Sequence, residues 1–556
     1  MLAWLALLGL LLAVLAPWAG RGRDVALVEP TAAQLPCLSY APFRRAGHTP
    51  FDAKLVVTPA QIEDDLRRLL PRTRCVRLYG TAHGLDAVPA IAQRLGLRVV
   101  LGAWLERDEA ANAAEVRRAV TLAIEFAAIV DRLIVGNEVL LRRELDVDAL
   151  ARWLDLARSQ LKHAQVPVSY ADVWEFWLRH DRLRAHVDVI TAHVLPYWED
   201  DPVAVGDAVA HVVAHTRRLQ QHFAPLPVWI GETGWPTAGR QRGAAAPGHV
   251  AQARFVRELV VRAAEERLDF NLIEAFDQPW KSALEGKVGG HWGLFDAQGH
   301  ERMHWRGAVR EDERWWRGPL AALIGALAGA LGAALVARAT GRPGWRAAAL
   351  VMPGAGLVAL LLVLPLAEAA QAAWRGLPTL APLPMGWTLV LLVGGVALVG
   401  RLAWPAGARA QPEDRHDEHE RHDRHLAATL LAMLFAAGCL VLPIVADPRY
   451  RELPWMPLAA AAGLLVAHRV QAPWPVFLHR PRCALGGALL IAAALLMLRE
   501  GPLNGEAWGV AGALVAMGLA ALWPGPAHRA PSRGAGPPAA ATASASSTAG
   551  AARSAE

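Results

Sequence analysis

The sequence predicts a (β/α)8 barrel followed by an all-α bundle of transmembrane helices. Short β-rich runs alternate with longer helical patterns between residues 36 and 278, which is typical of a parallel α/β sheet. Residues 318–523 are instead a series of apolar runs separated by short polar loops. With 54% hydrophobic and 19% charged residues, the chain of 556 residues is too apolar for an ordinary soluble enzyme and too charged for a protein buried wholly in a membrane.

The chain begins with an uncharged apolar segment, residues 1–20. We interpret it as either a signal anchor or a signal peptide, because small residues precede Gly20 in a pattern that suits cleavage. Arg21 and Arg23 follow the segment and no basic residue precedes it. We favour the uncleaved anchor.

Residues 21–317 are expected to form the barrel. Eight strands in about 240 residues fit a closed barrel, whose active site lies at the carboxyl ends of the strands. An open doubly wound sheet usually has a glycine-rich turn after its first strand, and the segment from Tyr40 to Phe43 is no such turn. The predicted strands are 36–40, 74–78, 98–103, 132–135, 166–170, 187–193, 227–231 and 270–276. Predicted helices include 59–70, 109–127, 147–163, 203–222 and 250–267.

The four cysteines form no metal-binding pattern. Cys37 and Cys75 fall in the first two predicted strands, so a disulfide is one alternative. We favour two buried thiols, since cysteine is commonly buried. The histidine-rich stretch 416–425 is interpreted as a solvated loop in preference to a metal site.

The second half of the chain is expected to hold about seven membrane spans, because each needs about 20 mostly apolar residues. If the barrel lies outside the cytoplasm, the inner loops and the tail carry fourteen arginines and the outer loops carry four. The positive-inside rule favours this orientation. Residues 524–556 are rich in alanine, serine, proline and glycine and should form a disordered tail. The expected spans are 319–337, 347–367, 385–404, 426–446, 455–470, 483–498 and 507–523.

Two of the predicted strands end in glycine and are followed closely by a glutamate. The fourth strand leads to Glu138, and the seventh leads to Glu232. Two carboxylates that face each other across a barrel mouth are what cleavage of a glycosidic bond requires. Solvated charge is expected for the other acids, namely Asp172, Glu175, Glu199, Asp200 and Asp201. Glu274 is expected to be a buried partner of a barrel arginine.

Several motifs of the predicted barrel resemble those of glycoside hydrolase family 17, the β-1,3-glucanase family. They are Val-Arg-Leu-Tyr-Gly (76–80), Val-Gly-Asn-Glu (135–138), His-Val-Leu-Pro-Tyr (193–197), Gly-Glu-Thr-Gly-Trp-Pro (231–236) and Phe-Asp-Gln-Pro-Trp-Lys (276–281). The resemblance covers residues 36–310 and is greatest to the bacterial membrane-bound branch, described as β-glucan synthases or transglycosylases. It implies that Glu138 is the general acid/base and that Glu232 is the nucleophile.

The resemblance also implies roles for neighbouring side chains. Asn137 would bond the sugar 2-hydroxyl, Tyr197 would donate to the nucleophile, and Lys281 matches an active-site lysine. Gln278 stands where plant members carry a glutamate. The tryptophans near strand ends would either stack on sugars or wall the barrel mouth. These are Trp198, Trp235, Trp280 and Trp292, and the weaker site candidates are Tyr40, Arg77 and Tyr79.

The expected function is that of a retaining enzyme that cleaves β-1,3-glucosidic bonds and transfers the glycosyl unit to another glucan. The alternatives are a membrane-bound hydrolase, a non-catalytic glucan-binding protein, and a transporter whose barrel trims its cargo. The expected partners are β-glucan, membrane lipid and a glucan synthase, with no cofactor, metal or nucleic acid. The expected location is a bacterial-type inner membrane, crossed several times, with the barrel in the periplasm.

Overall fold

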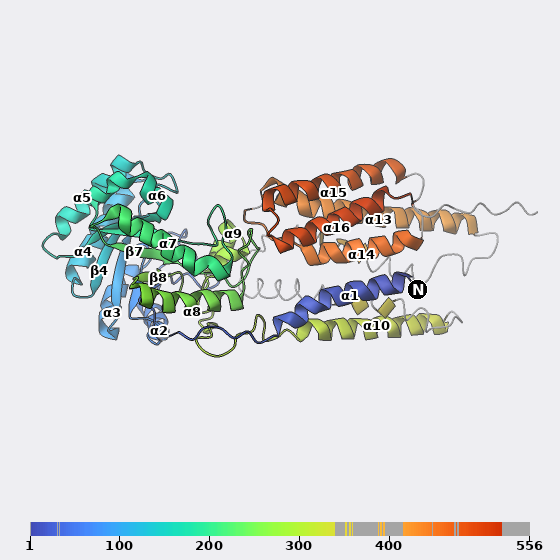
Figure 1. Cartoon of the computed structure of the whole chain (residues 1–556), viewed down its shortest axis with the longest axis horizontal. Coiled ribbons are helices and arrows are strands. Elements are labelled where there is room, and N and C mark those ends of the chain that lie inside the picture. Colours follow the sequence, from blue (N-terminus) through green and yellow to red (C-terminus); the bar gives the residue numbers. More distant parts are fainter. Residues whose placement is uncertain are drawn as a thin grey trace, which may run out of the picture.

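A computed structural model describes residues 2–339 except 31 and 33, scattered positions between 351 and 394, and residues 415–524 except 448, 472, 473 and 475–477. An α/β barrel occupies one end of the elongated molecule and long helices occupy the other (Figure 1). The expected spans 347–367 and 385–404 lie largely outside the described residues, as does the expected tail from residue 525 onward.

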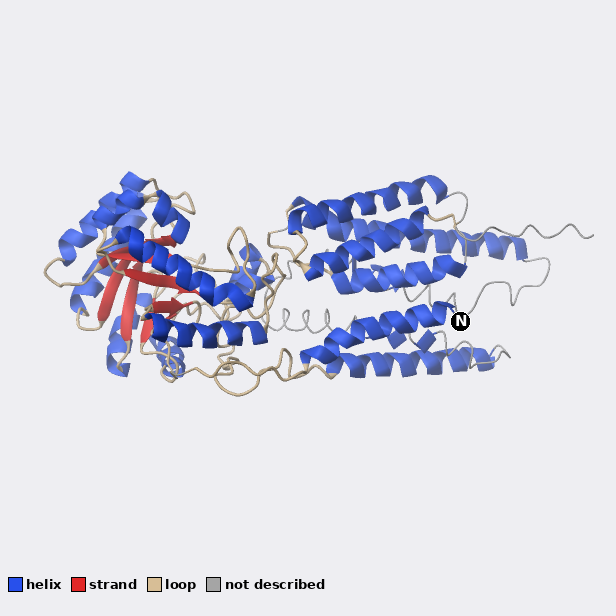
Figure 2. Ribbon diagram, viewed as in Figure 1, coloured by secondary structure: helices blue, strands red, loops and turns tan. Residues whose placement is uncertain are grey.

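Eight parallel strands form the closed barrel, in the order of the chain. The last strand pairs with the first, with Leu38 opposite Leu272, which confirms the predicted fold class. The carboxyl ends of the strands point toward the helical half of the molecule (Figure 2). The strands are β1 (Cys37–Ser39), β2 (Cys75–Arg77), β3 (Arg98–Ala103), β4 (Val130–Asn137), β5 (Val168–Val173), β6 (Val189–His193), β7 (Val228–Thr233) and β8 (Phe270–Leu272).

Three of the helices around the sheet, those that begin at residues 59, 109 and 147, follow a residue whose side chain caps them. The Thr58 side chain accepts from the Gln61 backbone N–H with Pro59 at the first helical position, and Asp108 and Asp146 accept backbone N–H groups in the same way. The surrounding helices are α2 (Pro59–Leu69), α3 (Val88–Leu95), α4 (Glu109–Glu125), α5 (Val147–Leu161), α6 (Trp174–Arg179), α7 (Val205–Phe223) and α8 (His249–Glu266). Shorter helical turns are η1 (Leu85–Ala87), η2 (Asp181–His186), η3 (Pro279–Lys281), α9 (Ser282–Glu285) and η4 (Lys287–Gly290).

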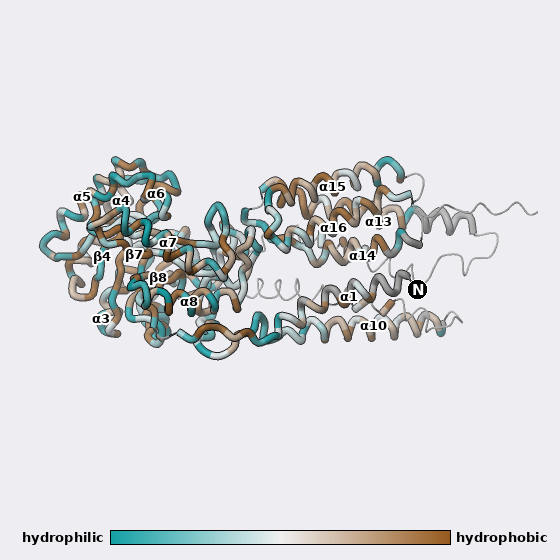
Figure 3. Tube along the Cα trace, viewed as in Figure 1, coloured by the Kyte–Doolittle hydropathy of each residue, from teal (hydrophilic) through white to brown (hydrophobic). Residues whose placement is uncertain are grey.

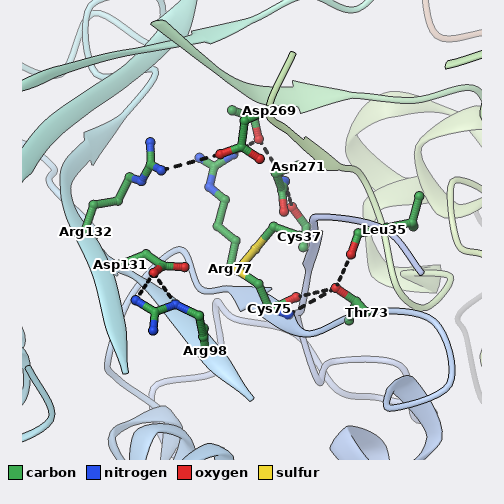
Figure 4. Close-up of a disulfide and its surroundings, with 12 residues drawn as sticks. Leu35, Cys37, Thr73, Cys75, Arg77, Arg98, Asp131, Arg132, Asp269 and Asn271 are labelled. Carbon is green, nitrogen blue, oxygen red and sulfur yellow. Dashed lines mark hydrogen bonds and ion pairs between the residues drawn. A yellow bond between two sulfur atoms is a disulfide. The ribbon is translucent and has the colours of Figure 1, made fainter. Parts of the chain in front are cut away.

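A disulfide lies inside the barrel, between β1 and β2. It joins Cys37 to Cys75, whose Cα atoms are 4.4 Å apart (Figure 4). The expectation of two buried thiols is therefore wrong. Adjacent parallel strands bring the two residues into the range of Cα separations that a disulfide spans, and they pack in one apolar cluster with Trp229.

In the residues that the structure describes, the helices of the other half are α1 (Leu2–Arg21), α10 (Arg317–Ala339), α13 (Arg415–Ala446), α14 (Trp455–Gln471), α15 (His479–Glu500) and α16 (Gly505–Leu522). Within the described residues, four segments are long and apolar enough to cross a membrane: 317–335, 424–446, 479–500 and 505–522. Apolar residues predominate along these helices, whereas polar and apolar residues mix in the barrel (Figure 3). The stretch 416–425 is not a loop, because it forms the beginning of α13.

Candidate active site

The backbone turns sharply where β4 ends, and this turn places Glu138 at the barrel mouth. Gly136 has φ +86°, and Glu138 itself has φ 52°, a left-handed conformation that is uncommon for a residue with a side chain. The Glu138 N–H donates to the Ala171 carbonyl of β5 at 2.7 Å, which holds the turn. Strained backbone of this kind persists where the surrounding structure fixes it, often at functional sites.

Glu138 and Glu232 approach each other at the mouth, with His193 between them. One side-chain oxygen of each glutamate and one nitrogen of His193 all lie within 4.8 Å of one another. His193 Nδ1 is 2.9 Å from Glu138 Oε1, and its Nε2 is 3.5 Å from Glu232 Oε1. The histidine is fully buried at the end of β6. Sequence reasoning quoted His193 only as part of a motif, although its place at the end of the sixth predicted strand was a usable signal.

Arg77, at the end of β2, provides the positive charge of the site. Its side chain is 1% exposed. One guanidinium nitrogen donates to the Gly231 carbonyl at 2.6 Å and to Glu232 Oε1 at 3.1 Å. The other donates to Asn137 Oδ1 at 2.6 Å. Arg77 therefore holds the Glu232 carboxylate in place through a charge-assisted hydrogen bond.

The role expected for Tyr197 is wrong, because its hydroxyl donates to the Arg240 carbonyl at 2.8 Å and not to Glu232. Tyr197 lies four residues beyond the end of β6, in the loop that leads to α7. Asn137 remains in place for its expected role. Arg77 donates to the oxygen of the Asn137 amide, which leaves the NH2 group as the part of this side chain that can donate to a hydroxyl.

The pKa of Glu138 lies below its usual value. Burial raises this pKa, but the hydrogen bond and the charge of His193, followed by the charges of Arg142 and Arg77, lower it more. Tyr79 stands beside the same groups, with its hydroxyl 2.9 Å from Ser39 Oγ. Burial, and then the negative charge of Glu232, raises the pKa of Tyr79 well above its usual value.

Asp172 belongs to the site, contrary to the expectation of solvated charge. It is fully buried, accepts from the Tyr170 hydroxyl, and accepts from the Val173 N–H at 2.8 Å. Burial raises its pKa to about 6, and the charge of Glu138 adds to the rise. The expectation was wrong because β5 continues to Val173, beyond the predicted end at residue 170. Asp200 and Asp201 are exposed, as expected.

Lys281 pairs with Glu274, at 3.0 and 3.1 Å from the two carboxylate oxygens. The expectation that Glu274 pairs with an arginine is therefore wrong. Burial raises the pKa of Glu274 to about 7, even though Lys281 opposes the shift. The Lys281 pKa is also raised: its burial lowers this pKa, but the charge of Glu274 raises it more.

Three residues expected to bind substrate directly have their polar groups satisfied inside the protein. Trp235 is 1% exposed, and its indole N–H donates to the Ala246 carbonyl, so it walls the barrel. The Tyr40 hydroxyl donates to Asp65. Gln278 is fully buried, donates to the carbonyls of Ala41 and Phe276, and accepts from the Trp280 indole.

Trp280 remains partly exposed, and it meets Phe51 edge-on at a ring distance of 5.5 Å. Phe51 is 71% exposed and comes from the segment between β1 and α2. Sequence reasoning missed it. The pair presents an aromatic surface beside the site.

In the described part of the chain, Glu138, His193 and Glu232 are the group with a spacing that suits a metal ion. The Arg77 guanidinium bonds the same Glu232 carboxylate, so a cation there would meet an existing positive charge. The donor set therefore fits acid–base chemistry better than it fits a metal.

Known proteins resemble the barrel. Residues 37–293 match the family model described as BtgE/BtgC glycoside hydrolase domain. The chain is 29% identical over 231 residues to a glucan 1,3-beta-glucosidase of Schizosaccharomyces pombe, which covers 39% of this chain and 72% of that protein. It is 26% identical over 226 residues to the probable beta-glucosidase btgE of Aspergillus fumigatus, which covers 40% of this chain and 39% of that protein.

One similar solved structure is a glycoside hydrolase family 17 beta-1,3-glucanosyltransferase from Rhizomucor miehei, with 22% sequence identity and a TM-score of 0.42. The similarity covers 49% of this chain and 98% of that one. The match of residues 37–293 and the two strand-end glutamates agree with the family motifs. Over residues 37–293 the barrel is therefore similar to glycoside hydrolases that act on β-glucan, and its strand-end motifs resemble those of glycoside hydrolase family 17.

Proposed function

We propose that the chain is a retaining enzyme that cleaves β-1,3-glucosidic bonds and transfers the released glycosyl unit to another glucan. The observation that carries this proposal is that one carboxylate oxygen of Glu138 lies within 4.8 Å of one carboxylate oxygen of Glu232. Retaining glycosidases have carboxyl groups about 5–5.5 Å apart, whereas inverting enzymes leave room for a water at about 6.5–9.5 Å. The relatives named for action on 1,3-beta-glucan support the choice of substrate.

In the first step, a Glu232 oxygen attacks the anomeric carbon while the glycosidic C–O bond breaks, and Glu138 gives its proton to the leaving oxygen. In the second step, the hydroxyl of an acceptor attacks the same carbon, the ester bond to Glu232 breaks, and the proton of the hydroxyl passes to Glu138. Arg77 holds Glu232 in place for both steps.

Transfer and hydrolysis differ only in the acceptor. A sugar hydroxyl bound in line at high effective concentration outcompetes bulk water. The exposed rings of Phe51 and Trp280 offer a surface that would hold such an acceptor. Plain hydrolysis is the second candidate.

We further propose that residues 21–317 form the catalytic domain and that residues 318–523 anchor it as a bundle of about seven spans. The barrel would lie on the periplasmic side of a bacterial-type inner membrane, supplied by a glucan synthase. The Cys37–Cys75 disulfide favours an oxidising compartment. The excess of arginines in the alternate loops favours the same side.

The test is to incubate the purified full chain in detergent with a β-1,3-oligoglucoside of defined length. Products longer than the substrate, with retained anomeric configuration, are expected. Glu232→Ala should abolish turnover. Glu138→Ala should retain activity on substrates with a good leaving group, and azide should restore part of its turnover. Products that are only shorter than the substrate at every concentration would leave a hydrolase, and near-normal activity of Glu232→Ala would contradict the mechanism.

A further inference from the structure

The barrel mouth is attached to the near ends of the long helices through a buried polar clamp. We call the residues of the helical half that contact the mouth, 449–453 and 500–506, the bundle face. Arg240, in the loop after β7, pairs with Glu500, and their side chains are 3% and 6% exposed. The neighbouring Gln241 N–H donates to Glu506 at 2.8 Å, and Asn504 donates to the Gln241 carbonyl at 3.0 Å.

The clamped loop follows the strand that holds Glu232, and it is tied to the loop after β6. β7 holds Glu232, and the loop that follows it reaches Arg240 eight residues later. The Tyr197 hydroxyl, from the loop after β6, donates to the Arg240 carbonyl at 2.8 Å. Arg242 donates in return to the Tyr197 carbonyl at 2.6 Å. The bundle face is thus fixed relative to the site by a chain of direct contacts.

The same face adds an aromatic ring to those at the mouth. Tyr450, between α13 and α14, meets Trp198 edge-on at 6.0 Å. Trp198 in turn stacks on Trp292 at 6.3 Å with an angle of 17° between the rings. Gly286, with φ +74°, lies so close to the Tyr450 carbonyl that a Cβ atom would clash with it. The contact between barrel and bundle is therefore close at Tyr450, and yet 39% of this residue is exposed.

The chemistry of the cluster suits a neutral polyhydroxylated chain. An exposed tyrosine offers an apolar ring face to the C–H surface of a sugar and a hydroxyl that donates or accepts. Arg242 and Arg449 lie beside it, with guanidinium carbons 5.3 Å from the Trp198 ring and 5.7 Å from the Tyr450 ring. Their N–H groups are donors suited to sugar hydroxyls.

We propose that the bundle face is part of the substrate-binding surface and that Tyr450 binds a glucose unit of a β-glucan chain, at a distance from the bond that is cleaved. The inference rests on the proposed function and extends it, because it gives the membrane region a role in binding beyond anchoring. A glucan that spans both regions has its reacting unit between Glu138 and Glu232 and a remote unit on Tyr450. Short oligosaccharides reach only the first of these.

The test compares kcat and KM of the purified full chain for β-1,3-oligoglucosides of increasing length. For Tyr450→Ala, KM should rise about 5- to 10-fold above a threshold length and stay unchanged below it, as expected for the loss of one stacking contact. Tyr450→Phe keeps the ring and loses only the hydroxyl, so its rise in KM above the threshold length should be smaller than that of Tyr450→Ala. Trp316→Ala removes another exposed aromatic of the helical half, 49% exposed, and should have no effect.

Two results would overturn the proposal: parental kinetics of Tyr450→Ala at every length, or an equal loss at every length, which would indicate a displaced loop. Glu500→Gln loosens the clamp and should reproduce the length-dependent rise in KM. A parent that is inactive on all lengths contradicts the proposed function. In that case, binding of the longest glucan is measured by tryptophan fluorescence titration. Saturable binding that Tyr450→Ala weakens would support a binding role for the bundle face. Equal affinity of the parent and the variant, or no binding by the parent, would refute it.

Discussion

Loss of the Cys37–Cys75 disulfide should destabilise the barrel by an amount that its loop length sets. The two cysteines are 38 residues apart in the sequence. Closing a loop of this size removes about 4 kcal/mol of conformational freedom from the unfolded chain. In a domain of this size, each kcal/mol corresponds to about 2–3 °C in the unfolding temperature. Cys37→Ser combined with Cys75→Ser should therefore lower that temperature by about 8–12 °C.

The assay is the temperature at which the full chain in detergent loses half of its glucan activity, together with near-UV circular dichroism. The matched control replaces Cys439 and Cys483, which are free thiols in α13 and α15, and should leave the barrel transition in place. Thiol titration of the denatured parent should find two free thiols before reduction and four after it. Four thiols without reduction, or equal transition temperatures, would refute the reasoning.

Three further predictions concern the buried titratable groups. His193→Asn keeps a polar atom near the Nδ1 position, which contacts Glu138, whereas His193→Gln keeps one near the Nε2 position. The glutamine variant should lose about 10- to 100-fold more activity on substrates with poor leaving groups than on activated aryl glucosides. The asparagine variant should not show this difference. Above pH about 6, ionised Asp172 raises the Glu138 pKa. Asp172→Asn should therefore move the alkaline limb of the kcat/KM profile to lower pH, and a limb that stays in place would contradict the electrostatic coupling of the two carboxylates. Burial raises the Glu274 pKa to about 7, above its ordinary value, so the stability that its protonated form contributes is complete below pH about 4.5 and is lost as pH rises through about 7. The free energy of unfolding should therefore fall by about 2–3 kcal/mol between pH 5 and pH 8, and heat inactivation should show a smaller dependence on pH in Glu274→Gln.

The barrel and the positions of its two glutamates were predictable because they depend on local patterns. A strand that ends in glycine and then glutamate marks the carboxyl end of a parallel strand, and this holds for β4 and β7. The catalytic roles of Glu138 and Glu232 remain predictions. His193, Arg77 and Asp172 were harder, because their place in the site depends on which strand residues point inward and on where each strand ends.

Partnerships across the barrel were the least predictable. The disulfide needs β1 and β2 to be adjacent in a particular register, which no local pattern gives. Tyr197 and Glu274 were assigned partners by family resemblance or by alternation, and the structure gives each a different one. The clamp between Arg240 and Glu500 joins residues 260 positions apart, in two regions that the sequence suggested were independent.

In the proposed mechanism, one buried site serves both steps of the transfer. In that mechanism Glu232 begins bonded to Arg77, and Glu138 must take up a proton before it can donate one, because its surroundings hold its pKa below the usual value. After the proposed first step Glu232 would be a neutral ester and Glu138 an anion in contact with His193. His193 also lies 3.4 Å from the same guanidinium, so it connects Arg77 to Glu138. Since the net charge of the site does not change, little reorganisation of its surroundings is needed, which is the condition under which fixed charges stabilise a transition state most effectively.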